Sequence, residues 1–414
     1  MTKTLDVYLY TDFVGNLIQN EHGEMVFTYA ESWLSHPHAL LLSHSLPLRK
    51  EPFSRNECRG FFAGILPEES KRDLVARNLG ISARNDFAMI EQIGGECAGA
   101  VTFIPAGAKL PATDYQYRPL SEDDLARILK ELPRRPLMAG EDGIRLSLAG
   151  AQDKIAVHVA GDKISVPLGG APSTHILKPA IAHFEGVVFN EATCMKLAAA
   201  IGLPVAPVEI RNTGGIDFLL VERYDRKIME GPAAPSPIQR MHQEDFCQAL
   251  GIVSENKYQR EGGPSLKNGF ELLRDVSTTP VIDLQRFLDA VIFNFLVGNH
   301  DAHGKNFSLT YDRDSIRLAP LYDIVCTAFY PELSRKMAMK IGGEYESSKI
   351  YPHHFEKMAE ECGLAKPLVK KRVTELAAAI IAALDTITIP HPVADGVKAL
   401  IEEHSQRTIA LFRD

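Results

Sequence analysis

The stretch "VIFNFLVGNHDAHGKN", residues 291–306, decides how the rest of the chain is interpreted. Its first seven residues are apolar except for Asn294, which predicts the end of a buried helix. The nine residues that follow contain two histidines, an aspartate, a lysine and two asparagines. Two interpretations are open. The loop is either a metal site built from His300, Asp301 and His303, or a catalytic loop in which only some of these side chains act.

The residues after this loop favour phosphoryl transfer. Two short strands are predicted within 307–319, joined by a turn at 312–314 and followed by Asp323. Phosphoryl transfer requires a loop aspartate that orients and deprotonates the incoming hydroxyl, and Asp301 suits that role. It also requires oxygen ligands for magnesium. Asn306 and Asp323 would supply them, because the hairpin returns Asp323 to the loop.

Two other interpretations of the loop compete with this one. Asp and Asn often only satisfy the backbone of a turn, but that leaves the clustering with two histidines and a lysine unexplained. A metal hydrolase would use His300, Asp301 and His303. Consecutive loop residues seldom converge on one ion, however, and no further histidine follows at a suggestive spacing. We therefore expect His303 either to contact a phosphate or to fix the loop, Lys305 to contact phosphate or substrate, and His300 to be structural.

A lysine and a glutamate earlier in the sequence predict a second part of the site. Lys178 ends the strand predicted at 174–178. Glu191 lies on the inward face of the next helix, residues 190–202, which Asn190 would cap. A carboxylate buried there needs a partner, and Lys178 would provide one, as in the strand-lysine and helix-glutamate pair of kinases. The alternative is that Glu191, in the first helical turn, interacts only with the helix dipole.

Two further stretches are candidates for nucleotide binding. The small residues of "SLAGAQDK", 147–154, would let backbone amides approach an anion, although a single glycine is equally consistent with a plain hairpin turn. The segment "LVERY", 220–224, would connect two lobes, and its backbone groups could bind adenine. The alternative for that segment is an ordinary strand end.

The periodicity of the chain predicts an α+β fold. Antiparallel strands are predicted within 4–29 and a strand at 144–148. Helices are predicted at 243–252, 267–275, 281–297, 353–362, 367–385 and 393–412. The predicted parts are an N-terminal α+β domain at 1–112, a linker and boundary helix at 113–141, a strand-rich nucleotide-binding lobe at 142–224 and a helical catalytic lobe at 225–414.

Composition excludes several classes of protein. The 414 residues are 45% hydrophobic and 24% charged, as in globular rather than disordered chains. A net charge of −8 argues against direct wrapping of nucleic acid. Six scattered cysteines, with no metal-binding or disulfide spacing, favour a reduced compartment. No signal peptide begins the sequence, and the longest apolar stretch, 377–384, is too short for a membrane span, so we expect a cytoplasmic protein without a membrane association.

Several motifs together resemble the HipA family of bacterial serine/threonine kinases, toxins of type II toxin–antitoxin modules. These motifs are "LSLAGAQDK" (146–154), "THILKP" (174–179), "VERYDR" (221–226), "QEDFCQALG" (243–251), "GNHDAHGKNFSL" (298–309) and "LAPLYDI" (318–324). The N-terminal part adds "VGNL" (14–17), "FTYAESWL" (27–34) and "FFAGILPE" (61–68). The resemblance covers essentially the whole chain and implies that the two lobes form a protein-kinase-like domain.

The resemblance implies a role for each matching residue. Asp301 would be the catalytic base, and Asn306 and Asp323 would bind Mg²⁺. Ser147 matches the family's autophosphorylated serine, whose modification expels the phosphate loop and switches the kinase off. The residues that would contact ATP are Ala149, Gly150, Ala151, Gln152, Asp153, Lys154, Lys178, Glu222, Arg223, Tyr224, His303, Gly304, Lys305, Asn306, Tyr322 and Asp323. Asp153 stands where the family usually has glutamate.

The implied function is phosphorylation of a translation component such as glutamyl-tRNA synthetase, an aminoacyl-tRNA synthetase, which leads to growth arrest or persistence. The implied partner is a HipB-like DNA-binding antitoxin, through which the kinase would contact DNA. Two other functions remain open on the sequence: a non-catalytic component that binds nucleotide and antitoxin, and a small-molecule phosphotransferase.

Overall fold

The computed structural model describes residues 2–108, 110, 115–181, 183–229, 238–312 and 315–413. The chain forms two compact units. Unit 1 contains Met1–Pro179, Arg211–Glu255 and Thr310–Asp314, and unit 2 contains Ala180–Ile210, Asn256–Leu309 and Ser315–Asp414. The predicted boundary at 112–113 and residues 313–314 of the predicted turn lie outside the described residues. The four predicted domain ranges stay a prediction.

The first sheet of unit 1 has the order β3-β2-β1-β4, and each neighbouring pair is antiparallel. The prediction of antiparallel strands within 4–29 is confirmed. Alternate residues of β1 point into the core, since Leu5, Val7 and Leu9 have no exposed surface. The elements of this region are β1 (Lys3–Leu9), β2 (Asp12–Gln19), β3 (Met25–Tyr29), α1 (Glu31–Leu34), α2 (Arg55–Gly64), α3 (Glu69–Leu79), α4 (Asp86–Ile93) and β4 (Val101–Pro105).

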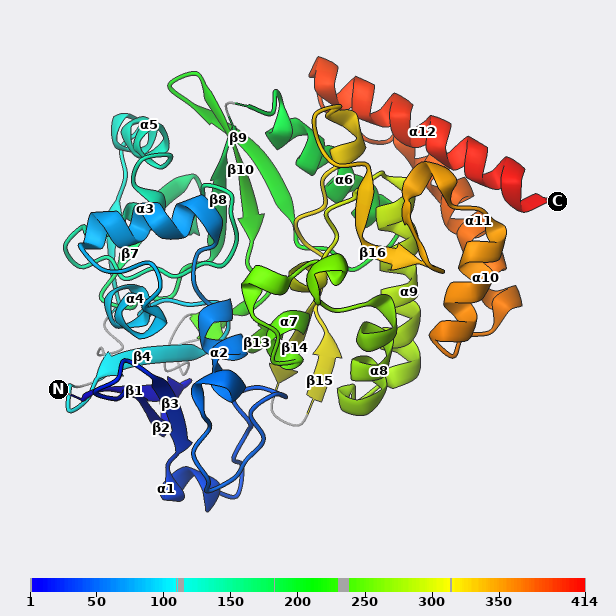
Figure 1. Ribbon diagram of the computed structural model, residues 1–414. Coiled ribbons are helices and arrows are strands. Elements are labelled where there is room, and N and C mark those ends of the chain that lie inside the picture. The colour runs from blue at the N-terminus through cyan, green and yellow to red at the C-terminus, as the bar shows by residue number, and fades with distance from the viewer. Residues whose placement is uncertain are drawn as a thin grey trace. The chain divides into compact units, whose positions relative to one another are not determined.

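The second sheet of unit 1 has six strands in the order β5-β7-β6-β8-β10-β9, with Arg211–Thr213 of β9 in this unit (Figure 1). In the turn between the last two strands, Asn212 Oδ1 accepts a hydrogen bond from the Gly215 N–H (3.2 Å). β5 lies within the predicted linker. The elements are β5 (Gln116–Pro119), α5 (Glu122–Glu131), β6 (Ile155–Ala160), β7 (Lys163–Leu168), β8 (His175–Pro179), β9 (Val208–Thr213), β10 (Ile216–Glu222), β11 (Arg226–Ile228), β12 (Ile238–Arg240), β13 (His242–Asp245) and α7 (Phe246–Ala249).

Two predicted elements of unit 1 are wrong. The strand predicted at 144–148 does not form, because that segment makes a single bridge, from Leu146 to Glu96. The helix predicted at 243–252 is instead strand β13 followed by one turn of helix, α7. Asp245 ends the strand and caps the turn through its side chain. Apolar spacing alone cannot distinguish a short buried strand from a helix.

Unit 2 is mostly helical. Helices α10, α11 and α12 lie side by side, and α11 and α12 also contact α6 and α9 (Figure 1). The apolar spacing predicted along 367–385 is confirmed, since Val369, Val373 and Leu376 are buried on α11. The elements are α6 (Val187–Ala200), α8 (Leu266–Val276), α9 (Pro280–Leu296), β14 (Ser308–Asp312, of which only Ser308 and Leu309 are in this unit), β15 (Ser315–Leu318), β16 (Lys336–Ile341), β17 (Glu344–Glu346), α10 (Pro352–Glu361), α11 (Lys366–Leu384) and α12 (Pro392–Arg413). Within the described ranges, no helix is long and apolar enough to cross a membrane.

The predicted start of α6 is wrong. The helix begins at Val187, after Gly186 in a left-handed conformation (φ +64°), and not after Asn190. A Cβ on Gly186 would lie 2.6 Å from Val393 Cγ2, so this close approach favours glycine there. Asn190 is buried inside the helix, where its side chain donates to the Cys326 carbonyl (3.0 Å) and accepts from the Cys326 N–H (2.8 Å).

A buried cluster of charges joins distant segments of unit 1. Glu96, 1% exposed, accepts hydrogen bonds on Oε1 from Arg223 (3.0 Å) and Arg226 (2.8 Å), and Arg240 lies 2.5 Å from its Oε2. Asp225 pairs with the first two arginines at 2.7 and 2.8 Å. Burial acts to raise the pKa of Glu96, but the three guanidinium groups together outweigh it and hold the pKa at about 2.

We predict that Glu96→Gln lowers the free energy of unfolding by about 3–5 kcal/mol, because it leaves buried guanidinium charge without its carboxylate. Urea denaturation at pH 7 measures this change. The control is Glu131→Gln on α5, where an exposed i,i+4 pair with Arg127 is lost at a cost of less than about 0.5 kcal/mol.

The pH dependence gives a second measurement of the same interaction. A carboxylate whose pKa is depressed on folding stabilises the protein above its ordinary pKa, and this contribution is lost as pH falls toward the folded pKa. For Glu96 the loss lies between pH 4.5 and about 2. Wild-type stability should therefore fall more steeply in that range than that of Glu96→Gln. Equal slopes, or a loss below about 1 kcal/mol at pH 7, would contradict the assignment.

Candidate active site

The predicted site residues fall into two groups, one in each unit. Unit 2 holds the loop after α9 and the end of the hairpin that follows it. The residues of this group are Asp301, His303, Gly304, Lys305, Asn306, Tyr322 and Asp323. The residues of the group in unit 1 are Ser147, Ala149, Gly150, Ala151, Gln152, Asp153, Lys154, Lys178, Glu222, Arg223 and Tyr224.

Buried polar side chains shape the loop after α9. Gly298 begins it in a left-handed conformation (φ +70°), and a Cβ there would lie 2.7 Å from the Cβ of Ala328. Asn299, 2% exposed, donates from Nδ2 to Asn294 Oδ1 (2.7 Å). Its own Oδ1 accepts a hydrogen bond from the Asp301 N–H (3.1 Å). The backbone of Asp301 is therefore held from inside the unit.

Asp301 is exposed, although its neighbours His300 and Ala302 are buried. Tyr258 donates a hydrogen bond from its hydroxyl to Asp301 Oδ1 (2.8 Å), and its ring meets His303 edge-on at a centroid distance of 5.3 Å. Sequence analysis missed Tyr258, because 43 residues separate it from Asp301 and only the fold brings the two side chains together.

The second half of the loop brings Asn306 and Asp323 together. Asn306 Nδ2 lies 3.3 Å from Asp323 Oδ2, and its Oδ1 accepts a hydrogen bond from the His303 N–H (3.1 Å). Asp323 has a left-handed backbone (φ +58°), which aspartate tolerates better than most residues. Tyr322 donates from its hydroxyl to the Lys305 carbonyl (2.7 Å), so the end of the hairpin is attached to the loop.

Asn306 and Asp323 are the residues that could hold a magnesium ion. Mg²⁺ prefers oxygen ligands and is commonly held by one or two carboxylates together with substrate phosphates rather than by a complete protein cage. The two side chains are adjacent, with Nδ2 of Asn306 facing the Asp323 carboxylate while its Oδ1 bonds to the His303 N–H. The amide would have to turn to direct its oxygen at a cation beside Asp323. Both groups carry oxygen atoms of the kind that the ion requires.

The alternative metal site of His300, Asp301 and His303 is not assembled. In the part of the chain that the structure describes, no group of three or more His, Cys, Asp or Glu side chains is arranged to hold a metal ion. The ring of His300 is bonded elsewhere, with Nδ1 3.3 Å from the Ser334 carbonyl and Nε2 2.8 Å from Ser347 Oγ. Burial lowers the pKa of His300 to about 4, so its ring is neutral at pH 7.

In unit 1, Lys178 lies on β8 inside the second sheet. It is 5% exposed, and its Cα pairs with that of Leu219 on β10. Glu222 ends β10 and is exposed. Tyr224, two residues later, donates from its hydroxyl to Gln243 Oε1 (2.5 Å). The connection predicted at 220–224 is thus a strand end whose aromatic side chain is fixed by a neighbouring segment.

Arg223, one of the predicted nucleotide contacts, has all of its N–H donors bonded within unit 1. Its guanidinium has five N–H donors, and all five are used within unit 1. They bond to Glu96, the Cys97 carbonyl, Ser173 and both oxygens of Asp225. Its backbone N–H donates to the Thr174 carbonyl (2.9 Å). Neither its side chain nor its N–H has a donor left for a nucleotide.

The predicted phosphate loop, 149–154, is half-buried and held against the segment before and within α3. The Gly150 carbonyl accepts a hydrogen bond from the Glu68 N–H (3.2 Å), and Asp153 pairs with Lys71 (2.7 Å). Ser147, just before the loop, has no exposed surface, and its hydroxyl donates to the Ile65 carbonyl (3.0 Å). Ser147 is therefore shielded from solvent while the loop is in this position.

Glu191 is buried in α6, with 1% of its surface exposed. Because the helix begins at Val187, Glu191 is its fifth residue and lies beyond the first turn. Interaction with the helix dipole falls off within the first turn, so the structure weakens that alternative. The predicted pairing of Glu191 with Lys178 would join the two units and stays a prediction.

The two sheets of unit 1, the helical unit 2 and the loop between a buried helix and a hairpin define a protein with a kinase-like fold. Family models match both parts of the sequence: the HipA N-terminal domain over residues 5–104 and the HipA-like C-terminal domain over residues 146–384. The chain belongs to the HipA family of kinase toxins. The α+β fold and the family resemblance predicted from the sequence are both confirmed.

Relatives named as kinases are similar to the chain over most of its length. The putative kinase Y4mE of Sinorhizobium fredii is 50% identical over 378 residues, which cover 90% of this chain and 89% of that protein. The serine/threonine-protein kinase toxin HipA of Shewanella oneidensis is 31% identical, covering 97% of this chain and 93% of that protein. The solved complex of Shewanella oneidensis HipA with HipB and operator DNA matches with a TM-score of 0.86 and 29% identity, covering 99% and 98% of the two chains.

Proposed function

We propose that the protein is an ATP- and Mg²⁺-dependent protein serine/threonine kinase. The observation that carries this proposal is an exposed carboxylate, Asp301, in a loop whose other residues are buried. The same loop leads into the bonded pair of Asn306 and Asp323. In this proposal Asp301 faces the substrate, and Asn306 and Asp323 would hold a metal ion. Similarity to relatives named as kinases supports the same assignment.

In the proposed reaction the substrate serine oxygen forms a bond to the γ-phosphorus of ATP, while the bond from that phosphorus to the β–γ bridging oxygen breaks and ADP leaves. Asp301 accepts the proton of the serine hydroxyl, and Tyr258 holds the Asp301 carboxylate in one orientation through its hydrogen bond. Asn306 and Asp323 would hold Mg²⁺, which when bound offsets the negative charge of the phosphates.

The remaining predicted residues are proposed to bind ATP. In unit 2, His303, Gly304, Lys305 and Tyr322 surround the proposed metal pair in the sequence and the fold. In unit 1, residues 149–154 and Lys178 would contact phosphates, and Glu222 and Tyr224 would lie on the adenine side. We assign Arg223 a positioning role instead, because its donors belong to the Glu96 cluster.

We further propose a HipB-like antitoxin as partner and a translation component, such as glutamyl-tRNA synthetase, as substrate. The similar Shewanella oneidensis protein was solved with HipB and operator DNA, which supports an antitoxin of that kind. The net charge of −8 is consistent with contact to DNA mainly through that partner. The non-catalytic binding component and the small-molecule phosphotransferase are the rivals that experiment has to exclude.

Incubation with labelled ATP and magnesium, with and without cell extract, tests the proposal. Wild type should label protein, and Asp301→Asn should lower the rate by at least about 1,000-fold because it removes the base and its charge. ATP binding by the variant, measured by calorimetry, should persist. His300→Ala should retain much more activity than Asp301→Asn, since its ring is bonded away from Asp301.

Each rival has its own outcome in this experiment. Bound ATP with no labelled protein from wild type would favour the non-catalytic component. Label that appears only in small molecules would favour the phosphotransferase. Equal loss of activity in His300→Ala and Asp301→Asn would contradict the roles given to these two neighbours.

Tyr258→Phe tests the positioning role of the tyrosine. Loss of a hydrogen bond to a charged group costs about 1.5–3 kcal/mol, so kcat should fall roughly 10- to 100-fold. KM for ATP should stay within about twofold, because Tyr258 is bonded to the proposed base and not to a proposed nucleotide contact. Steady-state kinetics with varied ATP separates the two constants. A rise in KM with unchanged kcat would assign Tyr258 to nucleotide binding instead.

Phosphorylation of Ser147 is expected to need release of the loop, because the hydroxyl has no exposed surface. A phosphate adds about two negative charges at neutral pH and cannot occupy the present position beside the Ile65 carbonyl. After incubation with ATP, mass spectrometry should find phosphate on Ser147, and limited proteolysis should cut within 147–154 faster than before. Ser173, also buried in unit 1, is the control and should stay unmodified. Absence of phosphate on Ser147 would end this part of the proposal.

A further inference from the structure

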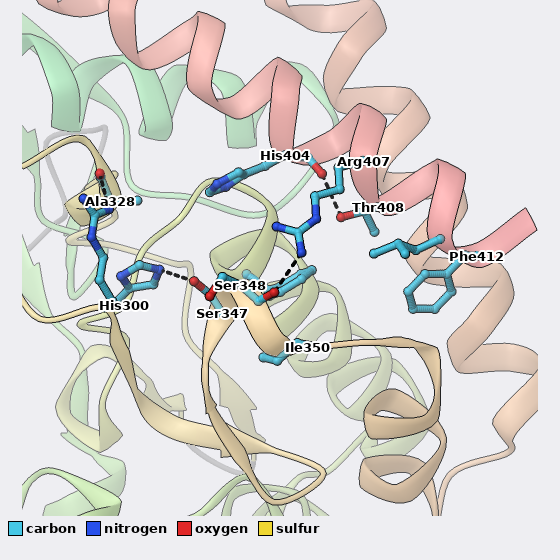
Figure 2. Close-up of a pocket in the computed structure, with 12 residues that line it drawn as sticks. His300, Ala328, Ser347, Ser348, Ile350, His404, Arg407, Thr408 and Phe412 are labelled. Atoms are coloured by element: carbon cyan, nitrogen blue, oxygen red, sulfur yellow. Dashed lines mark hydrogen bonds between the residues drawn. The ribbon is translucent and has the colours of Figure 1, made fainter. Parts of the chain in front are cut away.

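A cavity of about 290 Å³ lies in unit 2, on the side of the catalytic loop to which His300 turns. Figure 2 shows its walls: Arg407 and His404 extend from α12, and Ser347 and Ser348 face them from the segment after β17. His300 reaches the cavity from the start of the loop. None of the residues proposed to bind ATP or Mg²⁺ lines this cavity.

The charges around the cavity are positive. Arg335 and Arg407 line it, and none of its described lining residues is an aspartate or glutamate. In the described part of the chain, neither guanidinium forms an ion pair. Each is instead fixed by a backbone carbonyl, Arg335 by that of Ala328 (2.7 Å) and Arg407 by that of Ser348 (2.8 Å). Two arginines without carboxylates beside a cavity favour an anionic ligand.

Both arginines affect the pKa of the His404 imidazole. Burial lowers the pKa of His404; the charge of Glu403 and a backbone hydrogen bond with Leu296 oppose this, and the charges of Arg407 and Arg335 lower the pKa further. His300 and His404 are therefore neutral at pH 7 and can form hydrogen bonds without adding charge. The positive potential of the cavity comes from the arginines.

The wall of the cavity also offers hydroxyl groups and an apolar end. Ser347 Oγ lies 2.8 Å from His300 Nε2, and Ser348 lies beside it in the same segment. Ile350 and Phe412 lie away from His300 and form an apolar part of the lining (Figure 2). A ligand that fills the cavity would carry an oxyanion at one end and a compact apolar group at the other.

We propose that this cavity binds a phosphate monoester whose organic part is small and apolar. A phosphate monoester presents three terminal oxygens, which suits two guanidinium groups from different segments together with serine hydroxyls. A carboxylate presents two oxygens in one plane and is matched by a single arginine fork. The volume, near the lower limit of ordinary ligand pockets, suits a body about the size of one aromatic ring.

Isothermal titration calorimetry with phenyl phosphate tests the proposal on the full-length protein. Saturating ADP and magnesium are included so that a nucleotide site cannot contribute to the signal. Inorganic phosphate, benzoate and benzyl alcohol serve as comparison probes. The variants are Arg335→Gln and Arg407→Gln, both at exposed positions. The matched control is Lys349→Gln, which removes one positive charge from the same segment at a residue that does not line the cavity.

Phenyl phosphate should bind at one site, more tightly than the three comparison probes. Each arginine variant should weaken binding by about 10-fold or more, and Lys349→Gln by less than about twofold. The ring signals of His404, assigned in NMR spectra with His404→Gln, should move when phenyl phosphate is added to wild type. That measurement locates binding without relying on the stability of a variant.

Four outcomes would overturn the proposal. The absence of binding heat with phenyl phosphate, together with unmoved His404 signals, would show that the cavity does not bind it. Benzyl alcohol binding as tightly as phenyl phosphate would make the cavity an apolar pocket. Benzoate binding equally well would exclude a preference for phosphate monoesters. Equal affinities in Arg335→Gln, Arg407→Gln and wild type would place the ligand elsewhere.

Discussion

The buried carboxylate of Glu96 holds separate segments of unit 1 together. Glu96 would be unstable in its position without cations, and the three arginines that match it come from two separate parts of the chain. Guanidinium groups suit this task because they stay charged and bond in planar forks. Since Arg223 and Arg226 follow β10 directly, the cluster also fixes the direction in which the chain leaves the second sheet.

The loop after α9 in unit 2 does the opposite with Asp301. It leaves this carboxylate exposed to water while the rest of the loop is buried. Asn299 and Asn306 turn their amide groups inward and bond to the backbone of neighbouring loop residues. The loop therefore holds its shape without drawing on the Asp301 side chain. Such preorganisation keeps a reactive group in place before any substrate arrives.

Local patterns in the sequence were sufficient wherever a structure depends on near neighbours. Gly80 ends α3 in a left-handed conformation that favours glycine, and Ser121 caps α5 through the Asp124 N–H. The cluster of polar residues that includes Asp301 and Asn306 likewise predicted a loop after the buried helix. These features need only a few consecutive residues.

Features that depend on distant residues could not be predicted in this way. Tyr258 meets Asp301 only after the fold forms, and two of the donors of Arg223 bond to Glu96 and Cys97, more than 100 residues away. The true start of α6 is set at Gly186 by Val393, more than 200 residues later. His300 was expected to be structural, and the chemistry of the cavity beside it arises from three separate segments.

The burial of Ser147 affects the rate at which its hydroxyl can be modified rather than the affinity for a reagent. Its hydroxyl can react only in molecules whose loop has opened, whatever the reagent. When the chemistry is fast compared with closing, the rate of modification equals the rate of opening and no longer depends on how much reagent is present. The contacts of Glu68 and Lys71 with the loop would then set the rate of modification. Strengthening the Lys71–Asp153 ion pair would slow loop opening, and weakening it would speed loop opening.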